Sequence, residues 1–234
     1  MENYLTRLEM LYGKEKVGIL KRSRVAVFGV GGVGGYAVEA LARSGIGSLD
    51  IFDNDTVSVS NINRQIIATS ETVGKLKTEV ERERILIINP GCTVNAQPVF
   101  FAPDTLELFN FSQYDYVVDA IDFVTGKILL AVECEKAGVP IISAMGAGNK
   151  KRPELLEIAD VYQTSVCPLA RVMRRELKKR GVKGLTVVYS KEPPSAPLFS
   201  DGEKAPPASS CFVPACAGMI IAGKVINDLV GEKY

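Results

Sequence analysis

The sequence predicts an α/β protein built on a doubly wound, mainly parallel sheet with a small C-terminal extension lobe. Between residues 24 and 144, short β-branched runs alternate with longer amphipathic stretches, as in sheets whose strands are joined by helices. A glycine-rich turn follows the first run, and an aspartate closes the second. The 234 residues, 47% of them hydrophobic, suffice to bury one large core.

The predicted elements fall into three segments. A helical arm (1–23) precedes the main domain (24–145), and a C-terminal extension (146–234) completes the chain. Strands are expected at 24–28, 49–53, 93–99, 116–120 and 140–144, and helices at 33–44, 73–88 and 125–137. The extension is expected to contain strands at 155–161 and 185–190, a basic helix at 169–180 and a closing helix at 215–230. Residues 191–214 hold six of the twelve prolines, which predicts an irregular, mobile loop.

Composition excludes several kinds of chemistry. The chain has no histidine, which excludes Ser-His and Cys-His triads and most zinc hydrolases. The five cysteines are scattered and form no Cys-x-x-Cys pair, so we expect reduced thiols and no structural zinc. A thioester at Cys167, Cys211 or Cys216 is an alternative to buried or loop cysteines.

Charge and hydropathy predict where the protein works. A net charge of +1 leaves any nucleic-acid contact to a local cluster of basic residues. The longest apolar runs fall far short of the ~20 residues of a membrane span, and the N-terminus lacks the apolar core of a signal peptide. We therefore expect a cytoplasmic protein with no membrane partner.

The glycine-rich turn is the strongest motif. Gly29, Gly31, Gly32 and Gly34 lie between the first strand and the first helix, where backbone N–H groups point at a bound phosphate and side chains would block its approach. Asp53 closes the next strand, 19 residues after Gly34, and is expected to accept hydrogen bonds from ribose hydroxyls. The pattern predicts a Rossmann-like nucleotide site. The alternative is a turn required only for close packing of the helix on the strand.

Polar residues after the turn favour ATP over NAD. A triphosphate carries more charge than the pyrophosphate of NAD and usually brings Mg²⁺, so it needs further cations and a carboxylate. Arg64 and Lys77 are expected to bind phosphates, and Asp122, after the fourth strand, to hold Mg²⁺. Asn61 and Gln65 would orient phosphates or ribose. The structural alternatives are a solvated Arg64 and Lys77, and an Asp122 that caps the next helix.

Several motifs resemble the ThiF/MoeB-type adenylating enzymes, relatives of the ubiquitin-activating enzymes. They are the glycine turn, Glu39-Ala-Leu-Ala-Arg43-Ser-Gly45-Ile-Gly47, Asp53-x-Asp55, Asn61-x-Asn63-Arg64-Gln65, Lys77 and Asp119-Ala-Ile-Asp122. The resemblance continues to the branch that dehydrates threonylcarbamoyladenosine in tRNA. Its motifs are Asp160-Val-Tyr-Gln-Thr, Pro168-Leu-Ala-Arg171, Arg174-Arg-Glu-Leu-Lys178 and Val187-Val-Tyr-Ser190-Lys-Glu192.

The resemblance implies ATP-dependent activation of a carboxylate. ATP would lie over the glycine turn, with Asp53 on the ribose and Asp55 beside it, Arg64 and Lys77 on the phosphates and Asp122 at the Mg²⁺. The threonyl carboxylate of the modified adenosine would attack the α-phosphate. The carbamoyl group would then displace AMP and close a ring, with net loss of water. Because that attack is intramolecular, proximity supplies its rate and no protein nucleophile is required.

The resemblance also implies two kinds of partner. Arg7 lies in Thr6-Arg7-x-Glu9-x-Leu11, similar to a segment that in related enzymes donates an arginine to the ATP of a partner subunit, so a homodimer is expected. A solvated Arg7 is an equal alternative. One helical face carries four of the seven basic residues between positions 171 and 183, and with the resemblance we expect it to bind tRNA phosphates. These four are Arg171, Arg174, Arg175 and Lys178.

Other functions remain open from the sequence. A sulfur-carrier or ubiquitin-like protein activator would use the same nucleotide site but act on a protein C-terminus. An NAD-binding oxidoreductase or redox sensor would use only the glycine turn, and a nucleotide-binding protein without catalysis would release no AMP. Lys150, Lys151 and Arg152 are expected to extend the basic patch.

Overall fold

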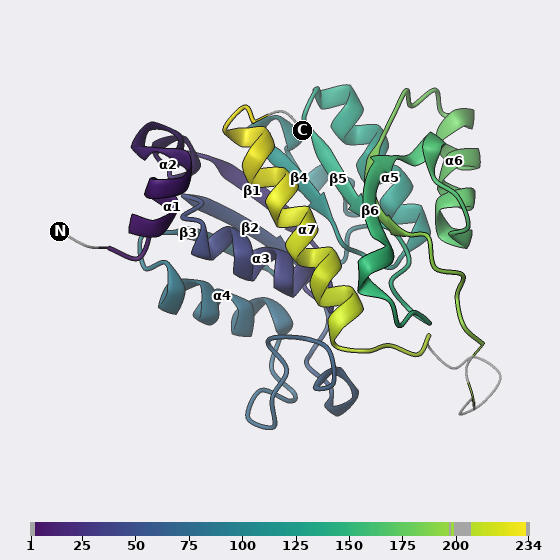
Figure 1. The fold of residues 1–234 in the computed structure, drawn as a ribbon, viewed down its shortest axis with the longest axis horizontal. Helices are drawn as coiled ribbons and strands as arrows, with labels where there is room; N and C mark the ends of the chain where they lie inside the picture. Colours follow the sequence, from purple (N-terminus) through teal and green to yellow (C-terminus); the bar gives the residue numbers. More distant parts are fainter. Residues whose placement is uncertain (1–2, 197, 199–206, 233–234) are drawn as a thin grey trace.

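The computed structural model describes residues 3–196, 198 and 207–232, and it confirms the α/β fold (Figure 1). One seven-stranded sheet has the order β3-β2-β1-β4-β5-β7-β6, in which β6 is antiparallel to β7 and every other neighbouring pair is parallel. The strands are β1 (Arg24–Phe28), β2 (Ser48–Phe52), β3 (Thr93–Gln97), β4 (Tyr116–Asp119), β5 (Ile141–Ala144), β6 (Leu156–Asp160) and β7 (Thr186–Ser190).

Helices cover both faces of the sheet. They are α1 (Thr6–Tyr12), α2 (Lys14–Leu20), α3 (Gly34–Arg43), α4 (Lys77–Ile88), α5 (Val124–Ala137), α6 (Pro168–Lys179) and α7 (Phe212–Leu229). One core joins α3 and α7 to one face, whereas α5 and α6 pack on the other (Figure 1). Alternation along β1 shows this division: Val25 and Val27 face the first core, and Ala26 and Phe28 the second. Burial on both faces explains the continuous apolar runs in the sequence.

Strands from the C-terminal part of the chain join the same sheet. β7 pairs in parallel with β5, and β6 forms the edge. Of the predicted loop 191–214, residues 197 and 199–206 lie outside the described residues. On either side of them, Ser195 N–H donates to the Asn149 carbonyl and Ala208 N–H to Asn149 Oδ1, both at 2.8 Å. Asn149 therefore anchors both flanks of this loop to the segment after β5.

Two helices begin three or more residues from their predicted starts, whereas the starts of α3, α5 and α6 differ by one residue. α4 begins at Lys77 rather than at residue 73, because residues 55–57 pair with residues 74–77 and close the intervening loop. α7 begins at Phe212 rather than at residue 215. Pro214 lies in its first turn, where the missing N–H has no helical partner to lose.

Helix α7 is long and apolar enough to satisfy the length and composition of a membrane span. Its buried residues, which include Ala217, Ile221 and Val225, pack into the core beside α3. The two helices approach closely, since a Cβ on Gly218 would lie 2.4 Å from the Val33 carbonyl oxygen. Core packing therefore accounts for the apolar residues on the buried side of this helix, which make up 44% of it.

Candidate nucleotide-binding site

The glycine turn follows β1 and packs closely against the residues that follow β4. Gly29 has a φ of +86°, and a Cβ there would lie 2.8 Å from the Ala120 carbonyl oxygen. A Cβ on Gly34 would lie only 1.8 Å from the Gly29 carbonyl oxygen. These two glycines are required by the fold itself, because any other residue would collide with backbone.

Gly31 and Gly32 occupy a different environment. A Cβ on Gly31 would have Gln65 Nε2 as its nearest neighbour, at 3.8 Å, and one on Gly32 would contact Pro214 at 3.4 Å. Neither position has a positive φ. No side chain caps the N-terminus of α3, although Gly35 N–H donates to the Gly31 carbonyl at 3.0 Å. The positive end of the helix therefore faces the turn without a competing side chain. Packing does not explain the glycine at position 31, whereas approach of a phosphate does.

Asp53, Asp55 and Lys77 form one cluster at the end of β2. Asp53 Oδ2 accepts the N–H of Val30 at 2.9 Å, which ties this carboxylate to the glycine turn. Lys77 Nζ donates to Asp55 Oδ2 at 2.7 Å and lies 3.8 Å from Asp53 Oδ1. Lys77 is 5% exposed, so it is not the solvated lysine of the structural alternative. Burial raises the pKa of Asp53, while Lys77 and backbone N–H groups oppose that rise.

The loop between β2 and α4 brings two of its three predicted residues toward the turn. Gln65 is buried, its Nε2 faces Gly31, and its Oε1 has no partner among the described residues. Arg64 passes close to Gly32 and donates through Nη1 to Ser60 O at 2.8 Å. Asn61 is instead buried and accepts the N–H of Ser58 at 3.1 Å. Its side chain closes the loop that carries Arg64 and Gln65.

Asp122 follows β4 at the same carboxyl edge of the sheet. Its side chain is exposed, and Ala120 N–H donates to the Phe28 carbonyl at 2.8 Å, so the β4–α5 loop runs beside the glycine turn. Among the described residues, no three His, Cys, Asp or Glu side chains gather into a metal site. Mg²⁺ commonly takes one or two carboxylates together with phosphate oxygens, and a single Asp122 fits that donor set once a nucleotide is bound.

Residues to which the sequence analysis assigned no role also shape this edge. Asp119 and Lys127 form a fully buried ion pair at 3.0 Å, and Ser143 donates to the other Asp119 oxygen. The half-exposed rings of Phe100 and Phe123 lie 5.2 Å apart, after β3 and next to Asp122. Asp119 was part of a recognised motif, but hydrophobic periodicity carries no signal for a lysine buried in a helix.

Arg7 does not reach the nucleotide site of its own chain. It is exposed on α1, and a neighbouring cavity of about 450 Å³ is lined by the arm and by Gly45 and Gly47, just before β2 begins. This is the amino edge of the parallel strands, opposite to Asp53, and Figure 1 shows α1 and α2 away from the loops that follow the strands.

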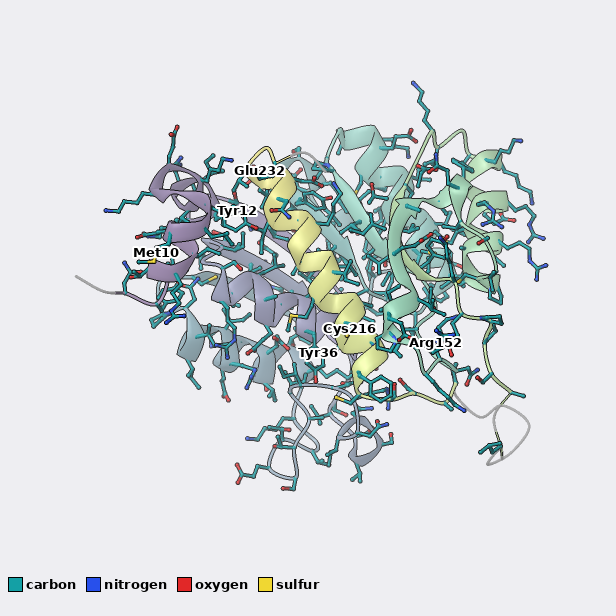
Figure 2. All side chains as sticks on the ribbon, in the orientation of Figure 1. Met10, Tyr12, Tyr36, Arg152, Cys216 and Glu232 are labelled. Carbon is teal, nitrogen blue, oxygen red and sulfur yellow. The ribbon has the colours of Figure 1, made fainter. Side chains whose placement is uncertain are left out.

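The basic face of α6 is partly committed to internal contacts. Arg171, Arg175 and Lys178 are exposed, and Figure 2 shows nitrogen-tipped side chains on the outer side of α6. Arg174 is half-buried and donates to the Thr164 carbonyl at 2.9 Å. Lys150 is buried and donates to the Glu192 carbonyl, so the expectation that it extends the surface patch is wrong.

One acid lies within this basic surface. Glu176 accepts hydrogen bonds from three cations, Arg180, Lys179 and Arg175, which lower its pKa to about 2. Those three cations are therefore partly neutralised, and Arg171 and Lys178 are the predicted residues whose charge is least compensated on α6.

The chain is similar in sequence and in structure to known enzymes that bind a nucleotide. A tRNA threonylcarbamoyladenosine dehydratase of Bacillus subtilis is 43% identical over 245 residues, covering 99% of this chain and 96% of that protein. One from Haemophilus influenzae is 36% identical and covers 100% and 97%. The crystal structure of the Escherichia coli enzyme in complex with ATP superposes with a TM-score of 0.89 at 33% identity, covering 97% of this chain and 94% of that one.

The family assignment extends over nearly all of the chain. The model of the ThiF family matches residues 5–231, a range that contains the glycine turn, the aspartate–lysine cluster, Asp122 and α6. The chain therefore belongs to the ThiF family, in its branch of tRNA threonylcarbamoyladenosine dehydratases.

Proposed function

We propose that this protein is an ATP-dependent enzyme of tRNA modification that adenylates the threonyl carboxylate of threonylcarbamoyladenosine and then releases AMP as the ring closes. The observation that carries the proposal is the 43% identity to a dehydratase of that name over almost the full length of both proteins. Gly31, which no packing contact explains, supports a phosphate at the turn.

Each part of ATP has a partner in this proposal. The phosphates would lie against Gly31 and the first turn of α3, and the ribose against Asp53. Lys77 would exchange Asp55 for a phosphate oxygen, which costs little because the Asp55 side chain is 63% exposed and water replaces the lost contact. Arg64, already beside the turn, would add a second cation.

Asp122 would hold Mg²⁺ with the phosphate oxygens of bound ATP. The ion would neutralise charge that builds on the α-phosphate and on the leaving pyrophosphate. The residues that contact ATP would hold the nucleotide in one position and leave its α-phosphate accessible to the substrate carboxylate. Ring closure needs no protein nucleophile, because the carbamoyl group and the acyl-adenylate belong to one molecule, which suits a chain without histidine.

The three segments of the chain would divide the work. The arm (1–23) would carry Arg7 to a partner subunit, residues 24–145 would bind ATP, and residues 146–234 would bind tRNA through Arg171, Arg175 and Lys178 on α6. Since its substrate is tRNA, the enzyme would act in the cytoplasm.

We also propose a homodimer, in which Arg7, exposed on α1 at the opposite edge of the sheet from Asp53, would complete the ATP site of a second copy. Mixing Arg7→Ala with Asp122→Asn tests this. Neither variant alone should be active, but a mixed dimer contains one site with both residues, so about a quarter of wild-type activity should return. Absence of recovery, with mixed dimers detected by native mass spectrometry, would refute the sharing.

The function itself is tested by mass spectrometry of tRNA nucleosides after incubation with enzyme, ATP and Mg²⁺. The modified adenosine should lose one water and AMP should appear in equal amount, whereas Asp122→Asn should give neither. ATP-pyrophosphate exchange stimulated by a carrier protein instead of by tRNA would favour a protein activator. Binding of NAD in place of ATP would favour an oxidoreductase.

A further inference from the structure

Lys127 of α5 is buried together with Asp119, the last residue of β4. Both side chains are 0% exposed, and Lys127 Nζ donates to Asp119 Oδ1 at 3.0 Å. Ser143 Oγ donates to Asp119 Oδ2 at 2.5 Å. Burying two charges is costly, and apolar residues of similar volume often give equal or greater stability. Stability alone is therefore a weak reason for this ion pair.

Lys127 also binds the backbone on both sides of Asp122. Its Nζ donates to the carbonyl of Ile121 at 3.0 Å, and its backbone N–H donates to the carbonyl of Phe123 at 3.0 Å. Asp119 Oδ1 accepts the N–H of Ile121 at 3.3 Å. The Lys127 side chain and Asp119 thus both hold Ile121, on one side of Asp122. On the other side, Phe123 is held by the first helical hydrogen bond of α5, which any residue at position 127 would make.

The loop held by Lys127 touches the glycine turn directly. Ala120 N–H donates to the Phe28 carbonyl at 2.8 Å, and a Cβ on Gly29 would lie 2.8 Å from the Ala120 carbonyl oxygen. The conformation of residues 120–123 consequently fixes the place of Asp122 relative to a phosphate on the turn. Mg²⁺ requires near-ideal octahedral geometry, so a carboxylate that meets it gains from a fixed backbone.

We infer that Lys127 is a positioning residue that, with Asp119, sets the β4–α5 loop so that the Asp122 carboxylate meets Mg²⁺ on bound ATP. The inference rests on the proposed function, and it gives Lys127 no contact with substrate or metal. A lysine that served the fold alone would affect stability, whereas a positioning lysine affects the contribution of Mg²⁺ to ATP affinity.

The test uses the double variant Lys127→Met/Asp119→Asn, which removes both charges and so leaves no unpaired buried ion. Lys136→Met is the control: it lies on the same helix, and its ion pair with Glu133 is on the surface. Calorimetry measures ATP affinity with Mg²⁺ and with EDTA, and thermal melting measures the stability of each variant. AMP formation on tRNA is measured in parallel.

We expect Mg²⁺ to strengthen ATP binding equally in the wild type and Lys136→Met. In the double variant, affinity in EDTA should stay at the wild-type level, while the gain from Mg²⁺ should fall about tenfold, as expected for loss of one charged contact of ~1.4 kcal/mol. Adding Asp122→Asn to the double variant should cause no further loss, since both changes act on the same contact.

An unchanged Mg²⁺ gain in a folded double variant would overturn the inference, as would an equal drop of both affinities. If the double variant does not fold, Ser143→Ala replaces it, because it removes only one hydrogen bond of Asp119. A folded Ser143→Ala protein with the full Mg²⁺ gain would then be the contrary result. A wild type that binds no ATP, or forms no AMP, would instead refute the proposed function.

Discussion

Substituting alanine at two glycines of the turn separates binding from folding. At position 31 the new Cβ would meet nothing closer than Gln65 Nε2 at 3.8 Å, an ordinary contact, and the backbone there has no positive φ. At position 34 the Cβ would lie 1.8 Å from the Gly29 carbonyl oxygen. The same chemical change is therefore harmless to the fold at one site and incompatible with it at the other.

The expected magnitudes differ accordingly. Gly31→Ala should keep the stability of the wild type within about 1 kcal/mol, because alanine also restricts the unfolded chain. It should weaken ATP binding roughly 10- to 150-fold, which corresponds to loss of one charged hydrogen bond of about 1.5–3 kcal/mol. In Gly34→Ala the new Cβ and the Gly29 carbonyl oxygen must move apart, which shifts the backbone. We expect the free energy of unfolding to fall by about 3 kcal/mol and the Tm to fall by roughly 6–12 °C.

Calorimetric titration with ATP and thermal melting of both variants measure these effects. If Gly31→Ala bound ATP with wild-type affinity, the phosphate would not lie against the turn, and the glycines would serve packing alone. If it lost stability as severely as Gly34→Ala, the reasoning from the environment of position 31 would fail.

Three further predictions concern charge. Burial and the nearby Glu39 raise the pKa of the fully buried Glu81 well above its usual value. The folded state therefore keeps a proton that the unfolded chain loses above about pH 4.5, and this stability is lost as the pH rises from there through the folded-state pKa. Glu81→Gln should thus gain on the wild type by up to about 1.4 kcal/mol per pH unit above pH 4.5 in urea unfolding; a constant difference would contradict this. Arg64→Ala should leave the Tm unchanged but raise the KM for ATP about tenfold in pyrophosphate exchange, and equal KM values would exclude a phosphate contact. Arg171→Glu/Lys178→Glu should weaken tRNA binding and reduce its salt slope by roughly 1.5–2, with Lys136→Met as the surface control; an unchanged slope would remove α6 from the RNA interface.

The sequence predicted the parallel strands well because their signal is local. The central strands β1, β2 and β4 are short, largely apolar runs that end at a glycine or an aspartate, and β1 has the predicted bounds 24–28. The start of α4 was wrong because residues 55–57 and 74–77, distant in sequence, pair and exclude the first predicted turn. The local hydrophobic pattern that predicts a helix contains no information about pairing with a distant segment.

Side-chain roles were harder to predict than elements for the same physical reason. Arg174 shares the basic face by periodicity, yet it is partly buried and donates to Thr164, ten residues earlier. Asn61 belongs to a recognised motif, yet its amide caps a turn. Helical periodicity indicates the direction of a side chain, whereas the partner that it meets depends on the tertiary fold.

Lys77 links the fold of the site to its chemistry. Its ammonium group lies against Asp55 and near Asp53, so it compensates the charge of the Asp53 carboxylate that ties β2 to the glycine turn. If Lys77 moved to a phosphate, the negative charge of Asp53 would lose its nearby cation. Ribose hydroxyls that donate hydrogen bonds to Asp53 at the same time would make up for that loss. Burial already raises the pKa of Asp53, so these hydroxyls would stabilise its charged form when the lysine turns to the phosphate. Ribose and phosphate are therefore expected to bind cooperatively, and a nucleotide without the ribose hydroxyls should lose affinity through Lys77 as well as through Asp53.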